Sequence, residues 1–552
     1  MLKHISLIIL MFSLQLAAQE PDTLIIDINN IILPVLSDGS IGGMNNKRCL
    51  FDGNSFLWSS GFFMSGTTDS SMWSNAVFES NGYRDYIPGK FGVDSNYASN
   101  KFFVIRSTDT AFGQSWNDWK SAVSQGAYFY DGDGDGIYNP VDLNGNGEWD
   151  ENEDRPDLIG DIMTFTVFND GKPSNKRVFY NINPQGIEIR QSIFAFEREK
   201  ENVLNNVIFF RYTIKNVGSH ETLDSVYFGV AADPDIGDYI IDLTGCDTLL
   251  NGTFAYKIDQ DGYYGANPPA FMVLLLQGPT IPDSGSSSII MRGPVLGTKV
   301  VENTKLLGMT SSHSHLRYGQ LGMPEDAKEM RNYLIGGMYR DGQRIDVGSF
   351  FLGNGDSLGT YADSVDPKYM FSGDPQKGEG WLCVNRNDWR FVISSGPFSL
   401  IKNQPVELIY AYIIARGNDP LNSVTVVKEY SKEIIKFYES NFTNFPVGIG
   451  KNRITVISQN FTLYQNYPNP FNPTTTIKYV IPQTDVGSKQ ALIVKLKIYD
   501  VLGREVATLV NQKQDPGEYE INFNAKELPS GIYFYKLQAG NFVQTKKMIL
   551  LR

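Results

Sequence analysis

Short runs of β-type residues alternate with turn clusters along most of the chain. One of these runs contains Phe209, Tyr212 and Ile214, which combine alternation with continuous apolar character, as strands in a sandwich core do. Regular short strands separated by Gly, Asn and Asp turns predict a mainly β, multi-domain β-sandwich protein. The clearest runs are "DTLIIDI", "NKFFVIRS", "DIMTFTVFND", "NNVIFFRYTIKNVGS" and "PVELIYAYIIARG".

Two segments have helical periodicity instead. Residues 324–334 ("PEDAKEMRNYL") start with Pro and acidic residues, which suits a helix N-terminus. The segment "NSVTVVKEYSKEIIKFYESNF" repeats apolar side chains on one face, and Asn422 or Ser423 can cap its start. We expect this second helix to close the central region. Its apolar face consists of Val424, Val427, Ile434, Phe437 and Tyr438.

Chain length and net charge add two predictions. The chain has 552 residues, which is too long for a single core and predicts several domains. Its formal net charge of -13 argues against a nucleic-acid partner, because phosphate binding needs a basic surface. An acidic surface instead suits a soluble surface protein that meets cations.

The N-terminus has the pattern of a secretory signal peptide. Lys3 gives a positive start, the apolar run 5–16 is too short to span a bilayer, and Ala17 and Ala18 predict cleavage after Ala18. No later segment is long and apolar enough for a membrane helix, so we expect no transmembrane segment in the mature chain. The chain therefore divides into a signal peptide (1–18), an N-terminal β-rich region (19–130), acidic loops (131–154), a central β-sandwich region with one closing helix (155–445), a linker (446–460) and a C-terminal module (461–552).

The C-terminal module has the pattern of a small antiparallel sandwich. Residues 502–504 predict a hairpin turn, and in "IYFYKL" Tyr533, Tyr535 and Leu537 point to one face. The three prolines within 468–473 favour an extended edge segment over a central strand.

At these residues the chain resembles the C-terminal sorting domains of the type IX secretion system of Bacteroidetes-like bacteria. The matching pieces are "YPNPFNP" from Tyr467, the turn "DVLGR" from Asp500, "SGIY" from Ser530, and the closing Lys547-Met548. The resemblance implies an Ig-like fold and transport across the outer membrane by the type IX machinery. It also implies, in many members, removal of the domain and attachment to surface lipopolysaccharide. We therefore expect a secreted, extracellular or cell-surface protein.

The densest acidic stretch, "DGDGDGIYNPVDLNGNGEWDENED", runs from Asp131 to Asp154. Calcium loops place oxygen ligands at positions 1, 3, 5, 7, 9 and 12, with Gly at position 6. This spacing fits twice, end to end, with Asp142 in both loops. The first loop would use Asp131, Asp133, Asp135, the Ile137 carbonyl, Asn139 and Asp142, and the second Asp142, Asn144, Asn146, the Glu148 carbonyl, Asp150 and Glu153.

Oxygen donors without His or Cys indicate Ca²⁺ rather than zinc. Bound cations would also explain how so many carboxylates coexist in so few residues. No helical pattern flanks both sides of the loops, which argues against a paired EF-hand sensor. The loops resemble those of thrombospondin type 3 repeats and dockerins, and a structural clamp between domains is the expected role.

Other acidic and nucleophilic motifs are weaker. Asp233, Asp235, Asp238 and Asp242 could converge on one ion, but their spacing fits no standard loop, and a turn with surface carboxylates fits equally well. "DQDG" at 259–262 is weaker still. "GDSLG" at 355–359 matches a nucleophile motif, yet the last histidine is His315, so no general base follows it.

The remaining histidine and cysteine patterns indicate no catalytic centre. His313 and His315 share one strand face, but no third metal ligand is evident. The three cysteines allow at most one disulfide, and buried free thiols are the simpler expectation. They are Cys49, Cys246 and Cys383.

The region before the C-terminal module also resembles a group of uncharacterised secreted proteins from the same bacteria, through stretches such as "GIEIRQSIFAF", "YFGVAADPDIGD" and "DLTGCDTLLNG". That resemblance implies export and calcium, but it carries no assigned activity and transfers no catalytic residue. Two functional classes stay open: a non-catalytic structural or adhesion component with a glycan or protein ligand, and a polysaccharide-active hydrolase or carbohydrate-binding protein. Trp116, Trp119 and Trp149 could stack on sugars, although packing is the commoner role of such residues.

Overall fold

A computed structural model describes residues 21–43, 48–93, 101–199, 202–350, 365–446, 462–464, 466, 469–481, 492–514, 517–540 and 542–551. The chain forms two compact units, Met1–Gly448 and Ile449–Arg552. Several sequence predictions lie outside the described residues. These are the signal peptide (1–18), the linker beyond Pro446, the "GDSLG" segment (355–359), and Tyr467 and Pro468 of the C-terminal motif.

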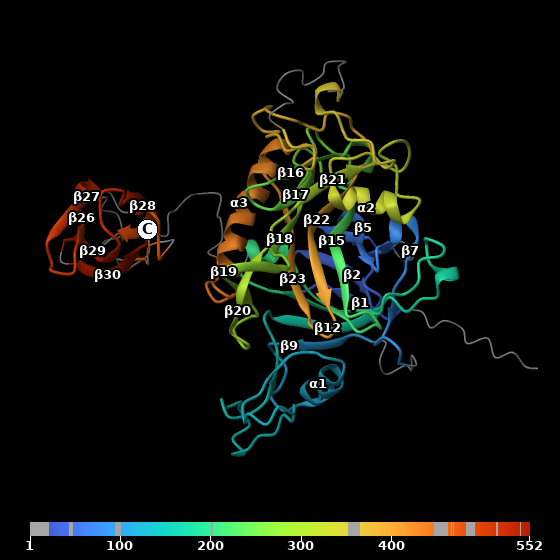
Figure 1. The fold of residues 1–552 in the computed structure, drawn as a ribbon, viewed down its shortest axis with the longest axis horizontal. Helices are drawn as coiled ribbons and strands as arrows, with labels where there is room; N and C mark the ends of the chain where they lie inside the picture. Colours follow the sequence, from blue (N-terminus) through green and yellow to red (C-terminus); the bar gives the residue numbers. More distant parts are fainter. Residues whose placement is uncertain are drawn as a thin grey trace, which may run out of the picture. The chain divides into compact units, whose positions relative to one another are not determined.

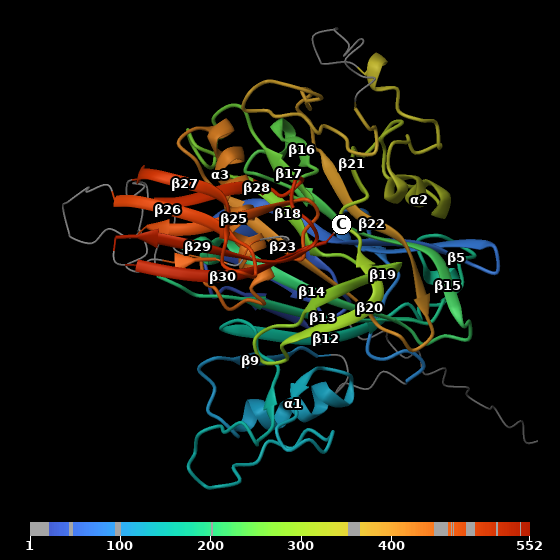
Figure 2. The ribbon, with the colours of Figure 1, turned by 60° about the vertical axis from the view of Figure 1, so that its left-hand side comes forward.

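The first unit is built on two large sheets, confirming the prediction of a mainly β protein (Figures 1 and 2). The first sheet, named sheet A, runs in the order β1-β2-β3-β5-β15-β22-β21, and β4, β6 and β7 branch from it. Its strands are β1 (Thr23–Ile26), β2 (Ile31–Leu36), β3 (Ile41–Gly42), β4 (Cys49–Phe51), β5 (Asn54–Thr68), β6 (Ser71–Phe78), β7 (Tyr83–Arg84), β15 (Thr222–Pro234), β21 (Ser311–His315) and β22 (Arg390–Ile401).

The second sheet, named sheet B, runs in the order β16-β17-β18-β23-β14-β13-β12-β8, and β9 also pairs with β12. Both sheets take strands from each side of the acidic segment, so residues 19–130 and 155–445 build one sandwich together. The strands of sheet B are β8 (Ile87–Pro88), β9 (Phe103–Arg106), β12 (Ile162–Asn169), β13 (Ile187–Ala195), β14 (Val207–Asn216), β16 (Leu243–Asp247), β17 (Gly252–Tyr256), β18 (Ala270–Gln277) and β23 (Val406–Ala415).

Strand β14 shows why the central strands read as nearly continuous apolar runs. Phe210 and Tyr212 join the core between the two sheets. Phe209 points to the opposite face of sheet B, where its ring lies 6.3 Å from that of Phe437 in helix α3. Both faces of the strand are therefore buried, and the simple polar–apolar alternation of a half-exposed strand is lost.

Helices cover both outer faces of the sandwich (Figure 1). Helix α3 (Pro420–Glu439) packs on β17, β18 and β23 of sheet B. Helix α2 (Ala327–Ile335) packs on β5, β6, β15, β21 and β22 of sheet A. The layers are thus helix, sheet, sheet, helix.

The helix starts differ from those predicted. Helix α3 begins at Pro420, and the carboxylate of Asp419 accepts a hydrogen bond from the Asn422 amide at 2.8 Å. Neither Asn422 nor Ser423 is therefore the cap, because Pro suits the first helical position and Asp the one before it. In the same way Asp326 caps α2, two residues beyond the predicted start.

Helix α1 (Gln114–Ser124) was not predicted. Its apolar signal consists of Trp116, Trp119, Ala122 and Val123, and its N-cap position is Gly113, which supplies no capping side chain. Trp119 is buried, and its indole N–H donates to the Tyr128 carbonyl at 3.0 Å. The tryptophans of this segment thus pack a helix, as the commoner role of such residues suggests.

Two antiparallel ribbons complete the first unit. The short pair β10 (Phe129–Tyr130) and β11 (Arg155–Pro156) joins the two ends of the acidic segment. The longer ribbon consists of β19 (Thr280–Met291) and β20 (Thr298–Leu306).

The second unit is a small antiparallel sandwich, as predicted. Tyr535 and Leu537 are fully buried in its core, whereas Ile532 on the other face is 42% exposed. Phe471 bridges to Leu550, which places the proline-rich segment along a sheet edge. The strands are β24 (Thr462–Leu463), β25 (Thr474–Ile481) and β28 (Gly517–Asn524) in one sheet, and β26 (Leu492–Tyr499), β27 (Glu505–Gln514), β29 (Gly531–Ala539) and β30 (Phe542–Leu550) in the other.

Candidate metal centre

The acidic segment is a long loop whose two ends are held together by a short strand pair. Strands β10 and β11 pair Phe129 with Pro156 and Tyr130 with Arg155, so the chain leaves and returns at the same place. The excursion lies next to α1 in Figure 1, and the Tyr138 hydroxyl donates to the Trp116 carbonyl at 2.9 Å. These contacts hold the loops against helix α1 and the β10–β11 pair.

The first loop is organised by its own carboxylates. Asp131 accepts from the Gly134 amide at 2.9 Å and from the Gly136 amide at 3.0 Å. Asp133 accepts from the Asp135 amide at 3.1 Å, and Asp135 in turn from the Ile137 amide at 2.7 Å. The side chains at positions 1, 3 and 5 are therefore held by amides of their own loop, and those of Asp131 and Asp133 lie close together.

The second loop repeats this arrangement eleven residues later. Asp142 accepts from the Gly145 amide at 2.6 Å and the Gly147 amide at 2.8 Å. Asn144 accepts from the Asn146 amide at 2.9 Å, and Asn146 from the Glu148 amide at 2.7 Å. Backbone amides, with that of Gly147 contributing most, hold the pKa of Asp142 below its usual value.

Each loop is closed by a different buried carboxylate. Glu153 accepts from the Leu143 amide at 2.6 Å and the Asp150 amide at 2.9 Å, which are positions 2 and 9 of the second loop. Asp154 accepts from the Gly132 amide at 3.0 Å and the Asn139 amide at 2.7 Å, which are positions 2 and 9 of the first. Glu153 and Asp154 thus make equivalent hydrogen bonds, each to positions 2 and 9 of one loop.

The hydrogen bonds add a second candidate, Asp154, for the closing position of the first loop, and the sharing of Asp142 stays a prediction. Spacing alone gives Asp142 to both loops, but the structure places its carboxylate within the amides of the second loop. Asp154 bonds to amides of the first. Since Asp154 follows Asp131 by far more than a single loop length, local spacing carries no signal for it.

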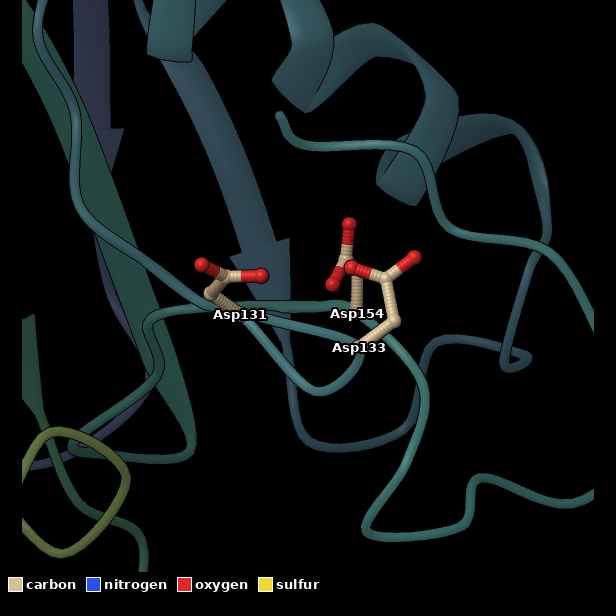
Figure 3. Close-up of side chains that lie close together, drawn as sticks. All are labelled: Asp131, Asp133 and Asp154. Atoms are coloured by element: carbon tan, nitrogen blue, oxygen red, sulfur yellow. The ribbon is translucent and has the colours of Figure 1, made fainter. Parts of the chain in front are cut away.

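The carboxylates of the first loop gather without a counter-charge. Oxygen atoms of Asp131, Asp133 and Asp154 lie within 4.8 Å of one another (Figure 3). In the part of the chain that the structure describes, no Lys or Arg forms an ion pair with these three residues. Like charges this close repel, and a divalent cation bound among hard oxygen donors would remove that repulsion.

Two of the other predicted ligands bond to neighbouring side chains. The Asn139 side chain accepts from Lys120 of α1 at 3.1 Å. Asp150 accepts from the side-chain amides of Asn144 and Asn146 at 2.6 Å and 3.0 Å. Carboxylate, amide and carbonyl oxygens are the donors that Ca²⁺ takes, so the residues present fit this ion.

The other aromatic of the segment has a structural role. Trp149 stacks beneath the Arg155 guanidinium, 4.4 Å from its ring centre, and its N–H donates to the Glu153 carbonyl at 2.9 Å. The ring therefore fastens the end of the second loop to β11.

The second predicted acidic group separates into two parts. Asp242 lies 3.4 Å from the buried Lys257 ammonium, which also binds Asp261 at 2.8 Å. Asp238 caps the short 3-10 helix η6 (Tyr239–Ile241). The four aspartates therefore do not converge on one ion.

Asp233 and Asp235 instead meet Asp388, and oxygen atoms of the three lie within 4.8 Å of one another. The contact arises because β15 and β22 pair antiparallel, with Ala232 opposite Phe391. Sequence spacing could not have found Asp388, which is brought in by strand pairing.

The histidine pair is a packing feature. His313 and His315 are fully buried, and the His313 ring stacks on Tyr333 of α2 at 3.8 Å. Within the described residues, no carboxylate or thiol joins them in a metal-binding group. Desolvation by burial lowers the pKa of His313 to about 3.

The cysteines are free and buried, as expected. Their burial raises the pKa of the thiols of Cys246 and Cys383 to about 12, so neither is a reactive thiolate. Cys49 is likewise buried and unpaired.

The comparisons with known proteins concern mainly the second unit. Residues 465–551 match the family described as "Secretion system C-terminal sorting domain". This match supports the predicted sorting domain, export through type IX secretion, and an extracellular or cell-surface location. No curated protein matches the chain.

Among solved structures, the chain is similar to a mutant Salmonella alpha-2-macroglobulin, with 9% identity and a TM-score of 0.14. The alignment covers 88% of this chain and 25% of that protein. Separately, no helix in the described ranges has the length and apolar character needed to cross a membrane.

Proposed function

We propose that the protein is a calcium-stabilised, non-catalytic structural or adhesion component of the cell surface, delivered by the type IX secretion machinery. The sorting-domain match at residues 465–551 supports delivery. By the same resemblance, attachment to surface lipopolysaccharide would follow export, and a predicted signal peptide would direct the first membrane crossing. The ligand would be a glycan or another protein.

One observation carries the calcium part of the proposal: two consecutive loops have matching hydrogen-bond patterns, and each has its own buried closing carboxylate, Asp154 or Glu153. Ca²⁺ bound in the first loop would be held by Asp131, Asp133 and Asp154, and in the second by Asp142 and Glu153. The ion would supply the positive charge that these carboxylates lack. In extracellular medium, a dissociation constant in the range of about 10⁻⁴–10⁻³ M suffices for occupancy.

Thermal unfolding with and without calcium tests this role. We expect calcium to raise the unfolding temperature of the wild type, and a variant with both Asp154→Asn and Glu153→Gln to lose that rise. Glu151→Gln is the matched control, because Glu151 lies in the second loop at none of the predicted ligand positions and is exposed. Equal calcium stabilisation of all three proteins would contradict the proposal.

Export has a separate test. A chain that ends before residue 461 should be made and should remain inside the outer membrane, whereas the full chain should reach the surface. Appearance of the shortened chain at the surface would contradict type IX delivery without bearing on calcium.

A further inference from the structure

The group formed by Asp233, Asp235 and Asp388 lines a cavity at one end of sheet A. Its volume is about 310 Å³, at the lower end of the range of about 300–1,000 Å³ typical of small-molecule sites. Asp233 comes from the end of β15, and Asp388 lies two residues before the start of β22. The remaining lining comes from β5, η2 (Glu79–Asn81), η6 and nearby loops.

Asp235 is the group in this cavity that requires a partner. It is only 7% exposed, and within the described residues no hydrogen bond or ion pair reaches its carboxyl group. Burial, together with Asp233 and Asp388, raises the pKa of Asp235 to about 8. Because Asp235 lines the cavity, a ligand bound there can supply the hydrogen bonds that the described chain does not.

The other two carboxylates are already engaged. Asp233 accepts from the Ser80 hydroxyl and lies 3.3 Å from the Arg390 guanidinium, although its Oδ1 has no partner. Asp388 lies 3.0 Å from the same guanidinium. Arg390 thus supplies the positive charge between these two acids, and a divalent cation placed there would be repelled by it.

The charges of the lining nearly cancel. Three acidic side chains face three guanidinium groups, those of Arg48, Arg317 and Arg390, and the raised pKa of Asp235 leaves at most about one positive charge in excess near neutral pH. Such a wall does not favour a cation. It offers many hydrogen-bond donors and acceptors at close spacing, which suits a neutral ligand with several hydroxyl groups.

Aromatic surface completes the cavity. Trp58 lies under the guanidinium of Arg48 at 5.1 Å, and Tyr239 of η6 is 47% exposed. Flat aromatic rings beside polar groups can pack against the apolar face of a sugar ring while its hydroxyls bond to the walls. Hydroxyls that donate to Asp235 would satisfy the buried carboxyl group.

We propose that this cavity binds one unit of a neutral carbohydrate, with Asp235 as the central acceptor and Tyr239 as a stacking surface. The inference rests on the adhesion role proposed above and gives it a ligand class. Binding fits better than hydrolysis, because Asp233 and Asp388 are both already paired with the Arg390 guanidinium.

The test uses the full mature protein and the methyl glycosides of glucose, galactose, mannose and N-acetylglucosamine, measured by ligand-observed NMR and titration calorimetry. We expect at least one to bind, Asp235→Ala to weaken it at least tenfold, and Tyr239→Ala to weaken it severalfold. Tyr239→Ala guards against misfolding because its side chain is exposed. Tyr263→Ala, at an exposed tyrosine outside the cavity lining, is its matched control and should bind as the wild type does.

Several outcomes would overturn the proposal. They are binding of none of the four glycosides, unchanged binding in both Asp235→Ala and Tyr239→Ala, and binding in the cavity of calcium alone or of glucuronic acid alone. The doubly substituted loop variant, Asp154→Asn with Glu153→Gln, keeps the two questions apart. If it loses calcium stabilisation yet binds the glycoside, both proposals stand. Loss of glycoside binding in Asp235→Ala but not in this loop variant locates the ligand in the cavity.

Discussion

The repulsion among close carboxylates is offset in different ways in the two acidic groups of the first unit, the proposed calcium loops and the cavity. In the loops, Asp131 and Asp133 are exposed, are organised by backbone amides, and have no ion-pair partner among the described residues. In the cavity, Asp233 is buried and shares Arg390 with Asp388. The loops must take their positive charge from solution, whereas the cavity contains its own.

This difference separates an ion site from a ligand site. Amide hydrogen bonds fix the loop carboxylates in place, and at Asp142 they lower the pKa and so favour the ionised form. In the cavity, burial favours the protonated form of Asp235 and leaves it without a hydrogen-bonding partner in the described chain. Acidic residues alone do not identify a metal site, and the neighbouring cations decide between the two roles.

The largest expected effect is on calcium-dependent stability. At a calcium concentration 100-fold above its dissociation constant, one site adds about 2.7 kcal/mol to the free energy of unfolding. Asp154→Asn should remove about that amount by disabling the first loop, and Glu153→Gln should do the same for the second. Denaturant unfolding in calcium and in chelator measures both. If either variant alone removed all calcium dependence, the loops would not be independent.

The next effect is the change in the free energy of unfolding with pH. Its sign is opposite to that expected for an exposed acid in a salt bridge. Because the pKa of Asp235 is raised to about 8, the folded state holds its proton more tightly than the unfolded chain does. The free energy of unfolding should therefore fall as pH rises from about 4 to 8. Asp233 and Asp388 strengthen this effect, and Arg48 and Arg390 weaken it.

Asp235→Asn should abolish that dependence and increase stability at pH 8 by about 1–3 kcal/mol, because an amide stays neutral and avoids the cost of ionising a buried carboxyl group. Unfolding curves at pH 5 and pH 8 provide the measurement. A variant that is less stable than the wild type at pH 8 would show that Asp235 has a partner after all.

The smallest effect is expected at Asp142. Its pKa is lowered by the loop amides, so its contribution to stability is present above the ordinary pKa of 3.8 and is lost as pH falls through the lowered value. In chelator, Asp142→Asn should flatten the acid limb of the stability profile slightly, below about pH 4. In calcium, the same variant should weaken the second loop alone. Weakening of both loops would favour the register in which Asp142 is shared.

The sequence predicted what depends on local pattern. Hydrophobic runs predicted the mainly β fold, and the ligands that the Gly-containing acidic repeat predicts for both loops stay a prediction. Helix α1 was missed because its short apolar stripe contains two tryptophans and lacks a capping side chain. Asp154 and Asp388 were missed because their neighbours come from distant positions in the chain. Pairing of β15 with β22 positions Asp388, and pairing of β10 with β11 brings Asp154 back to the first loop. Local spacing encodes neither.

Calcium stoichiometry tests the central claim most directly. Equilibrium dialysis against calcium should find two ions bound to each wild-type chain and one ion bound to either Asp154→Asn or Glu153→Gln. Glu151→Gln should still bind two. If Asp154→Asn also bound two ions while Asp142→Asn bound none, the first loop would close on Asp142 instead, and the assignment of a separate closing carboxylate to each loop would be wrong.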